Sequence, residues 1–309
     1  MPIPDARGSG GTTELDYDAG SGDDACPKRI SAGVCDTSVF DEIRDGQCCY
    51  IRTSGTCCGR PFLDGERMLG AAPRVRADWL AGSVADAREL DAEMRRALGR
   101  AWLEDARMEH ASIASFAKLT LQLLALGAPA ELIEAAQRAA LDEMVHAQAC
   151  FGLASRYYGE ALGPAELPMP EKLLVPSLAE AAAAAVREGC VAETLAAAEA
   201  AEQLRNATDP QARAALSRIA ADEARHAAIA YRFVRWALAQ PDKTVSGAVR
   251  EAFASARAQQ TATQLGDDLV GDTTTWRAHG RLTQSEKQIC ARAAWRDIIE
   301  PCASALQDS

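Results

Sequence analysis

The chain of 309 residues is long enough to bury a full hydrophobic core, and its formal net charge is -11 at pH 7. This acidic balance excludes nucleic acids and anionic membranes as expected partners, because both are bound through concentrated Lys and Arg. Apolar residues make up 48% of the chain and aromatic residues only 5%, so we expect a core of Ala, Leu and Val in closely packed helices. No apolar run reaches the roughly 18 to 20 residues that a membrane-spanning helix needs.

The first 90 residues differ in composition from the rest of the chain. Residues 1–25 are rich in Gly, Ser and Asp and predict a flexible tether without the apolar stretch of a signal peptide. Residues 26–90 predict a small module of loops and a hairpin, since turn-forming Gly and Pro follow a dense group of cysteines. The six cysteines of this group are Cys26, Cys35, Cys48, Cys49, Cys57 and Cys58.

Two interpretations of these cysteines are open, namely three disulfides in an oxidising compartment or a metal-binding knot in a reducing one. The spacing matches no usual zinc pattern, which favours disulfides. In the stretch CCYIRTSGTCC the two Cys pairs lie symmetrically about Thr53, and Ser54-Gly55 predicts the turn of a small hairpin. A tether and a disulfide module together favour a protein held outside the cytoplasm.

Residues 91–240 predict four long helices. The first helix is expected to start after an N-cap at Asp91, and the second at Pro129. A capping box of Ser177 and Glu180 predicts the start of the third, and an N-cap with a first-turn proline at Asp209-Pro210 predicts the start of the fourth. The first helix is expected to stop near Gly127 and the second near Tyr158.

The connections predict how these helices are arranged. A short turn near Gly127 joins the first and second helices, and another at residues 206–209 joins the third and fourth. Each pair is therefore expected to form an antiparallel hairpin. Residues 161–176 contain prolines and can extend along a 30-residue helix, which is roughly 45 Å long. This crossover allows the second and third helices to run parallel. Residues 241–309 predict accessory helices around 243–264 and 283–305.

A repeated phrase contains two of the four histidines. LDEMVHA at residues 141–147 returns as ADEARHA at residues 221–227, and each copy places a Glu and a His on one helical face. Both pairs lie on the apolar stripe of their helix, where charged groups are costly unless they are paired or bound to a metal. A single copy would favour an ion pair within the helix, whereas two matched copies favour a metal site.

The other two helices offer one carboxylate each for such a site. Glu109 and Glu193 lie on the apolar stripes of the first and third helices, at the levels of the two repeats. Glu104 and Glu188 compete with them but lie about 140° around the helix, and we assign them to a flank or to solvent. His110 points about 100° away from Glu109, and His279 falls in a polar loop expected at the surface, so neither is expected to be a ligand.

This pattern resembles the ferritin-like di-iron carboxylate superfamily, in which two helices give one Glu each and two give a Glu-x-x-His. The resemblance covers residues 91–240 and implies an all-α four-helix bundle with a long crossover between helices two and three, binding two iron ions or iron with manganese. The implied ligands are Glu109, Glu143, His146, Glu193, Glu223 and His226.

The resemblance also implies individual roles. Glu143 and Glu223 would bridge the two metals, and Asp142 and Asp222 would accept the far imidazole N–H of the histidines. The alternative for these aspartates is an ordinary contact to the His four residues later on the same helix.

The function implied is a reaction with dioxygen or peroxide, with an oxidase or oxygenase of unknown small-molecule substrate as the leading hypothesis. No catalytic residue beyond the metal ligands is predicted, and a homodimer is one assembly we consider. A rubrerythrin-type peroxidase is disfavoured because the chain has no Cys-x-x-Cys, and a storage ferritin because of the additional segments. The alternatives are a ferroxidase or iron-binding protein, and a non-catalytic binding protein that a metal stabilises.

Overall fold

The computed structural model divides the chain into two compact units, Met1–Gly55 and Thr56–Ser309. The residues that it describes are 29–33, 36–44, 47–54, 60–65, 67–80, 87, 89–170, 176–262 and 272–307. The division near residue 55 differs from the boundary near residue 90 that composition predicts. Residues 60–80 therefore belong to the same unit as the long helices.

The first unit contains one antiparallel sheet. Its strands are β1 (Arg29–Gly33), β2 (Asp36–Arg44) and β3 (Gln47–Ser54), adjacent in chain order. Phe40 is paired with Tyr50 and Glu42 with Cys49, which leaves Asp41 as the extra residue of a β-bulge. Cys48 and Cys49 thus lie in a strand that pairs with the preceding strand.

The other half of the hairpin expected at Ser54-Gly55 lies outside the described residues. The same holds for four of the six clustered cysteines, namely Cys26, Cys35, Cys57 and Cys58. The disulfide pairing of the module stays a prediction.

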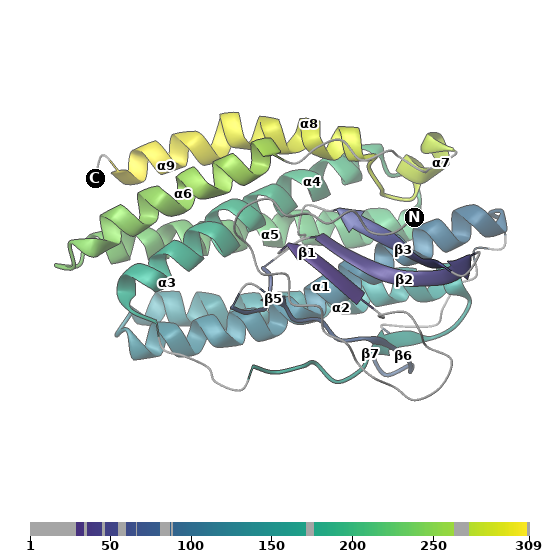
Figure 1. Cartoon of the computed structure of the whole chain (residues 1–309), viewed down its shortest axis with the longest axis horizontal. Helices are drawn as coiled ribbons and strands as arrows, with labels where there is room; N and C mark the ends of the chain where they lie inside the picture. Colours follow the sequence, from purple (N-terminus) through teal and green to yellow (C-terminus); the bar gives the residue numbers. More distant parts are fainter. Residues whose placement is uncertain are drawn as a thin grey trace. The chain divides into compact units, whose positions relative to one another are not determined.

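The second unit is mostly helical, and its two longest antiparallel pairs lie side by side (Figure 1). Its helices are α1 (Ala92–Ala125), α2 (Ala130–Tyr158), α3 (Leu178–Ala185), α4 (Ala192–Asn206), α5 (Pro210–Leu238), α6 (Thr244–Ala262), α7 (Thr273–Ala278), α8 (Gln284–Ala294) and α9 (Glu300–Gln307), with π-helical segments at Val186–Val191 and Trp295–Ile299. Short strands form two further pairs, β4 (Leu63–Asp64) with β5 (Arg67–Met68) and β6 (Pro73–Val75) with β7 (Leu162–Pro164).

The four predicted helix starts are confirmed. A side-chain oxygen of Asp91 accepts the N–H of Met94 at 2.8 Å, and one of Asp209 accepts the N–H of Ala212 at 2.9 Å. Ser177 and Glu180 form both hydrogen bonds of the capping box. These caps satisfy N–H groups that the first turn of a helix leaves without a partner.

The predicted third helix is interrupted, because the π-helix Val186–Val191 joins α3 to α4. A π-turn adds one residue to the local repeat, which rotates the residues after it relative to those before it. The one sequence sign of this is Gly189, a glycine inside an otherwise helical pattern.

The accessory segments form helices close to the predicted positions. α6 lies against α3, and α8 lies against α4, on the side away from α1 and α2 in Figure 1. The short helix α7 was not predicted.

Two apolar cores lie along the helices, one on each side of a polar layer. One core contains Phe116, Leu123, Phe233, Val249 and Trp295, among others. The other contains Leu98, Trp102, Phe151, Leu216 and Trp276. On α1, α2 and α5 the residues of the Glu and His pattern fall between these two groups in sequence, whereas on α4 Glu193 lies between Val191 and Leu195 of the first group.

Residues 60–80 are attached along α1, which explains why they belong to the helical unit. The hydroxyl of Ser112 donates to the carbonyl of Arg60 at 2.8 Å, and Nε of Arg107 donates to the carbonyl of Ala71 at 2.8 Å. Phe62 is buried in a small cluster against this helix. Within the described residues, no helix is long and apolar enough to cross a membrane.

Gly189 allows the π-helix to approach α5 closely, and this can be tested. A Cβ added at Gly189 would lie 2.3 Å from Cβ of Ala230, so Gly189→Ala should lower the free energy of unfolding by about 1 to 3 kcal/mol. Gly152→Ala on α2, where a Cβ meets nothing within 4 Å, is the control and should stabilise by up to about 1 kcal/mol. Urea unfolding followed by circular dichroism compares them, and equal effects would contradict this account.

Candidate metal centre

Four helices bring six ionisable side chains to one place in the helical unit. Their ligating atoms form two groups in which all atoms lie within 4.8 Å of one another. The first group is Glu109, Glu143, His146 and Glu223, and the second is Glu143, Glu193, Glu223 and His226. Glu143 of α2 and Glu223 of α5 belong to both groups.

The six side chains are buried from water. Glu143, Glu193 and Glu223 are 0% exposed, and the other three are at most 2% exposed. Four carboxyl groups in such surroundings are unfavourable unless cations or protons neutralise them.

Nine buried atoms of these residues have no hydrogen-bond partner within the described part of the chain. They include both carboxylate oxygens of Glu143, Glu193 and Glu223, one oxygen of Glu109, and Nδ1 of both histidines. Buried polar atoms are nearly always hydrogen-bonded in proteins, so nine exceptions that face one another need a partner of another kind. Carboxylate oxygens and imidazole nitrogens are both metal ligands, and the cluster can therefore hold metal.

Ion pairs within each helix do not satisfy these atoms. Nδ1 of His146 lies 3.6 Å from Glu143, and Nδ1 of His226 lies 3.6 Å from Glu223, both beyond hydrogen-bond distance. The closest contact is between the helices, where Nδ1 of His226 lies 3.0 Å from Glu143. This contact is an ion pair when His226 is protonated, and it is not a hydrogen bond, because both atoms remain among the nine.

The second nitrogen of each imidazole faces an aspartate of the other helix. Nε2 of His146 lies 2.9 Å from Asp222, and Nε2 of His226 lies 3.4 Å from Asp142. The same-helix contact that was the alternative for these aspartates is therefore not the one formed. Arg225 contacts both carboxylates and joins the two pairs.

The surroundings divide the carboxyl groups into two kinds. Burial, together with the charge of Glu143, raises the pKa of Glu109 well above its ordinary value. Burial and the charge of Glu223 do the same to the pKa of Glu193. Burial also acts to raise the pKa of Glu143 and Glu223, but contacts that include both histidines outweigh it and lower the pKa.

The histidines respond in the opposite sense. Burial acts to lower the pKa of His226, but the carboxylates of Glu143 and Glu223 raise it to about 10. The pKa of His146 is raised for the same reason, with Glu109 as a further contact. Without metal, these shifts favour imidazolium at both histidines, carboxylates at Glu143 and Glu223, and the protonated forms of Glu109 and Glu193.

The competing candidates lie elsewhere. Glu104 pairs with Arg107 at 2.8 Å, and Glu188 pairs with Arg60 at 3.3 Å. His110 packs edge-on against the ring of Trp79, 5.1 Å between ring centres. None of these three belongs to the two groups among the described residues.

His279 corrects an expectation, because it is not a surface residue. Its side chain is 12% exposed, and its Nδ1 lies 2.8 Å from the hydroxyl of Tyr157.

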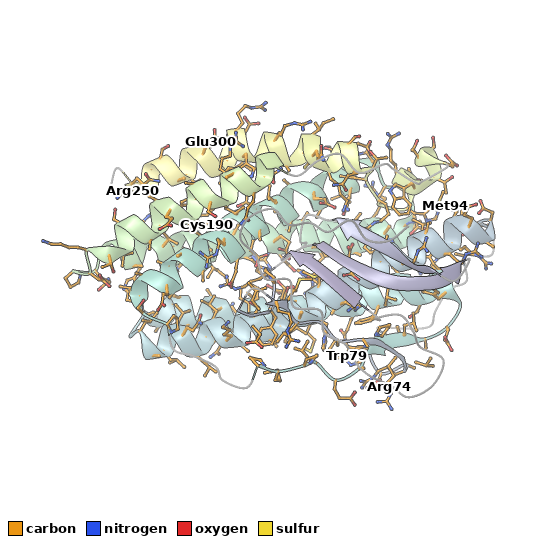
Figure 2. All side chains as sticks on the ribbon, viewed as in Figure 1. Arg74, Trp79, Met94, Cys190, Arg250 and Glu300 are labelled. Atoms are coloured by element: carbon orange, nitrogen blue, oxygen red, sulfur yellow. The ribbon has the colours of Figure 1, made fainter. Side chains whose placement is uncertain are left out.

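Arg60 is a neighbour of the cluster that sequence reasoning missed. Its side chain is 4% exposed and lies over the ring of Phe116, which in turn packs edge-on against His226. Its positive charge opposes the effect of burial on the pKa of Glu193. The π-helix that holds its partner Glu188 also holds Cys190, which Figure 2 labels and which is fully buried.

Comparisons with known proteins add no relative to this picture. Neither a scan against protein-family models nor searches of curated proteins and of solved structures find a match. The functional conclusions rest on the residues themselves.

The unpartnered carboxyl of Glu193 should destabilise the metal-free protein. The folded state holds the Glu193 proton more tightly than the unfolded chain, so this group costs stability as pH rises above about 4. Glu193→Gln should therefore raise the free energy of unfolding at pH 7 by about 1 to 3 kcal/mol.

Urea unfolding in the presence of a chelator measures this change. Glu134→Gln, an exposed glutamate of α2, is the control and should leave stability unchanged. A large loss of stability in Glu193→Gln would contradict the protonation pattern of the cluster.

Proposed function

We propose that this protein is a ferritin-like di-iron carboxylate protein that reacts with dioxygen or peroxide. The observation that carries the proposal is the set of nine buried, unpartnered oxygen and nitrogen atoms that converge from four helices. Histidines and carboxylates without thiolates suit iron or manganese better than structural zinc.

The arrangement of the helices supports the ferritin-like part of the proposal. Asp142 contacts His226 and Asp222 contacts His146, so α2 and α5 run antiparallel. Since the short turn before Pro210 makes α4 and α5 antiparallel as well, α4 runs parallel to α2. The connection over residues 159–177 then acts as the long crossover of such bundles.

The ligand roles follow from the two groups. Glu143 and Glu223 would bridge two ions, with Glu109 and His146 completing one site and Glu193 and His226 the other. Two ions of charge +2 carry four positive charges and would neutralise the four carboxylates.

The aspartates would fix the orientation of the ligating rings. Asp222 and Asp142 accept the N–H at Nε2, so that Nδ1 carries its lone pair toward the centre. Arg225 supplies positive charge to both aspartates from the exposed side.

When bound, the two ions supply the electrons with which dioxygen or peroxide is reduced. The protein positions the ligands, keeps bulk water out of the cluster and holds the protons of its histidines and of Glu109 and Glu193 until metal displaces them. An oxidase or oxygenase is the leading function under this proposal.

Metal content tests the ligand assignment. The protein loaded with ferrous iron should bind two ions per chain, and Glu143→Gln or Glu223→Gln should lose both because each contacts both groups. Glu104→Gln and Glu188→Gln are matched controls on α1 and the π-helix and should keep two ions. Elemental analysis after desalting measures the content, and unchanged stoichiometry in Glu143→Gln and Glu223→Gln would contradict the assignment.

The same preparations test reactivity. Anaerobic ferrous protein is mixed with dioxygen or peroxide, and oxidant consumption is followed. Consumption that ends after both ions are oxidised fits an oxidase awaiting its substrate, whereas continued oxidation of added ferrous iron fits a ferroxidase. A loaded protein that reacts with neither oxidant would overturn the enzyme proposal and leave a metal-stabilised binding protein.

A further inference from the structure

Arg60 carries a buried positive charge beside the candidate metal centre. Its side chain is 4% exposed, and its Nε has no hydrogen-bond partner within the described part of the chain. Nη2 lies 3.3 Å from Glu188, whose side chain is 14% exposed and so keeps part of its contact with water. A guanidinium loses much of its hydration on such burial, so this position needs support from the surrounding structure.

Two serines of α1 hold the backbone from which the Arg60 side chain starts. The hydroxyl of Ser112 donates to the carbonyl of Arg60 at 2.8 Å, and the hydroxyl of Ser115 donates to the carbonyl of Pro61 at 3.1 Å. Both serines are buried, which shields these hydrogen bonds from water. The point at which Arg60 enters the helical unit is therefore fixed by α1.

The Arg60 side chain extends toward one side of the centre. Its guanidinium lies 5.5 Å from the centre of the Phe116 ring, which packs edge-on against His226 with 5.1 Å between the ring centres. A Cβ added at Gly189 would lie 3.1 Å from Nη1 of Arg60, so the glycine leaves room for the guanidinium. Gly189 belongs to the π-helix that leads directly to Glu193. Arg60 thus lies near the ligand group that contains His226 and Glu193, which we call the second ligand group.

The two ligand groups differ in the charges around them. The charge of Arg60 opposes the carboxylates that surround Glu193, whereas the groups that act most strongly on Glu109 all belong to the cluster. A buried positive charge repels a divalent ion strongly, because little water lies between them to screen it, and this repulsion falls with distance. It therefore weighs more on the second ligand group than on the first, which contains Glu109 and His146.

The contacts of the imidazoles favour the same order. Nε2 of His146 lies 2.9 Å from Asp222, whereas Nε2 of His226 lies 3.4 Å from Asp142. A closer carboxylate makes an imidazole a stronger metal ligand. The first ligand group is thus the better site on both counts.

We infer that Arg60 acts on the centre through its charge, so that the second ligand group binds its ion more weakly, and after the first. Arg60 precedes α1 and belongs to none of the four helices that supply the ligands. A residue outside these helices would therefore control the affinity for one of the two ions. The inference rests on the proposed function, because it takes both ligand groups to hold metal.

Zinc, a diamagnetic ion of charge +2 that binds carboxylates and imidazoles, serves as the probe. Protein with nitrogen-15 in its histidines is titrated with zinc at pH 7, and the ring signals of His146 and His226 report the two ligand groups separately by NMR. In the wild type, the His146 signals should change with the first ion and the His226 signals with the second. Arg60→Met removes the charge and keeps an apolar contact with Phe116, so the ratio of the two dissociation constants should fall roughly tenfold.

Glu188→Gln separates the effect of charge from that of structure, because it breaks the same ion pair as Arg60→Met. Without Glu188 the charge of Arg60 is unopposed, so the ratio should rise by about threefold or more, while two ions still bind at saturation. Arg60→Lys, which keeps the charge, should retain the wild-type order of binding.

Two bound ions with the same ratio in wild type and Arg60→Met, or with His226 responding first in wild type, would overturn the inference and leave the proposed function standing. The same holds if the ratio changes in one direction in both Arg60→Met and Glu188→Gln. If Arg60→Met does not fold, a ratio in Glu188→Gln that is unchanged or smaller overturns the inference. If the wild type binds no zinc at either histidine, the proposed function fails and the inference fails with it.

Discussion

The structure depends on the burial of four carboxyl groups and two imidazoles against one another. Mutual repulsion and the loss of water make this arrangement unfavourable in the absence of cations. Protonation of Glu109, Glu193 and both histidines, which their raised pKa values favour, offsets part of that cost in the metal-free protein. Under the proposed function, two divalent ions would replace these protons and at the same time give a partner to the unpartnered atoms of the cluster.

The rest of the helical unit holds this cluster in place. An apolar core on each side fixes the helices, while N-caps at Asp91 and Asp209 set where α1 and α5 begin. The crossed contacts between α2 and α5 fix both the register of these helices and the orientation of the rings. Close approach at Gly189 and the buried Arg60 support the side of the cluster that holds Glu193.

Much of this could be predicted from sequence because its signals are local. Caps, prolines and a periodic apolar stripe locate the helices, and two Glu-x-x-His copies on such stripes indicate convergence. The π-helix could not be predicted, because its one local sign is Gly189, and the close approach of this glycine to Ala230 involves a helix distant in sequence. Arg60 was missed because nothing in a loop sequence indicates which residue enters a core. The ion pair of Lys287 on α8 with Glu199 was missed because its two residues are distant in sequence.

Calorimetric titration of the metal-free protein with a divalent ion at pH 7, repeated in buffers of different ionisation enthalpy, tests the central claim most directly. In the metal-free cluster the raised pKa values favour protons on both imidazoles and on Glu109 and Glu193, and the pKa of about 10 at His226 lies well above pH 7. The account predicts that two ions bind per chain and that about four protons are released, two from the imidazoles and two from the carboxyl groups. It also predicts that the affinity for the ions rises as pH rises. Binding of two ions without proton release, or no binding at all, would contradict it.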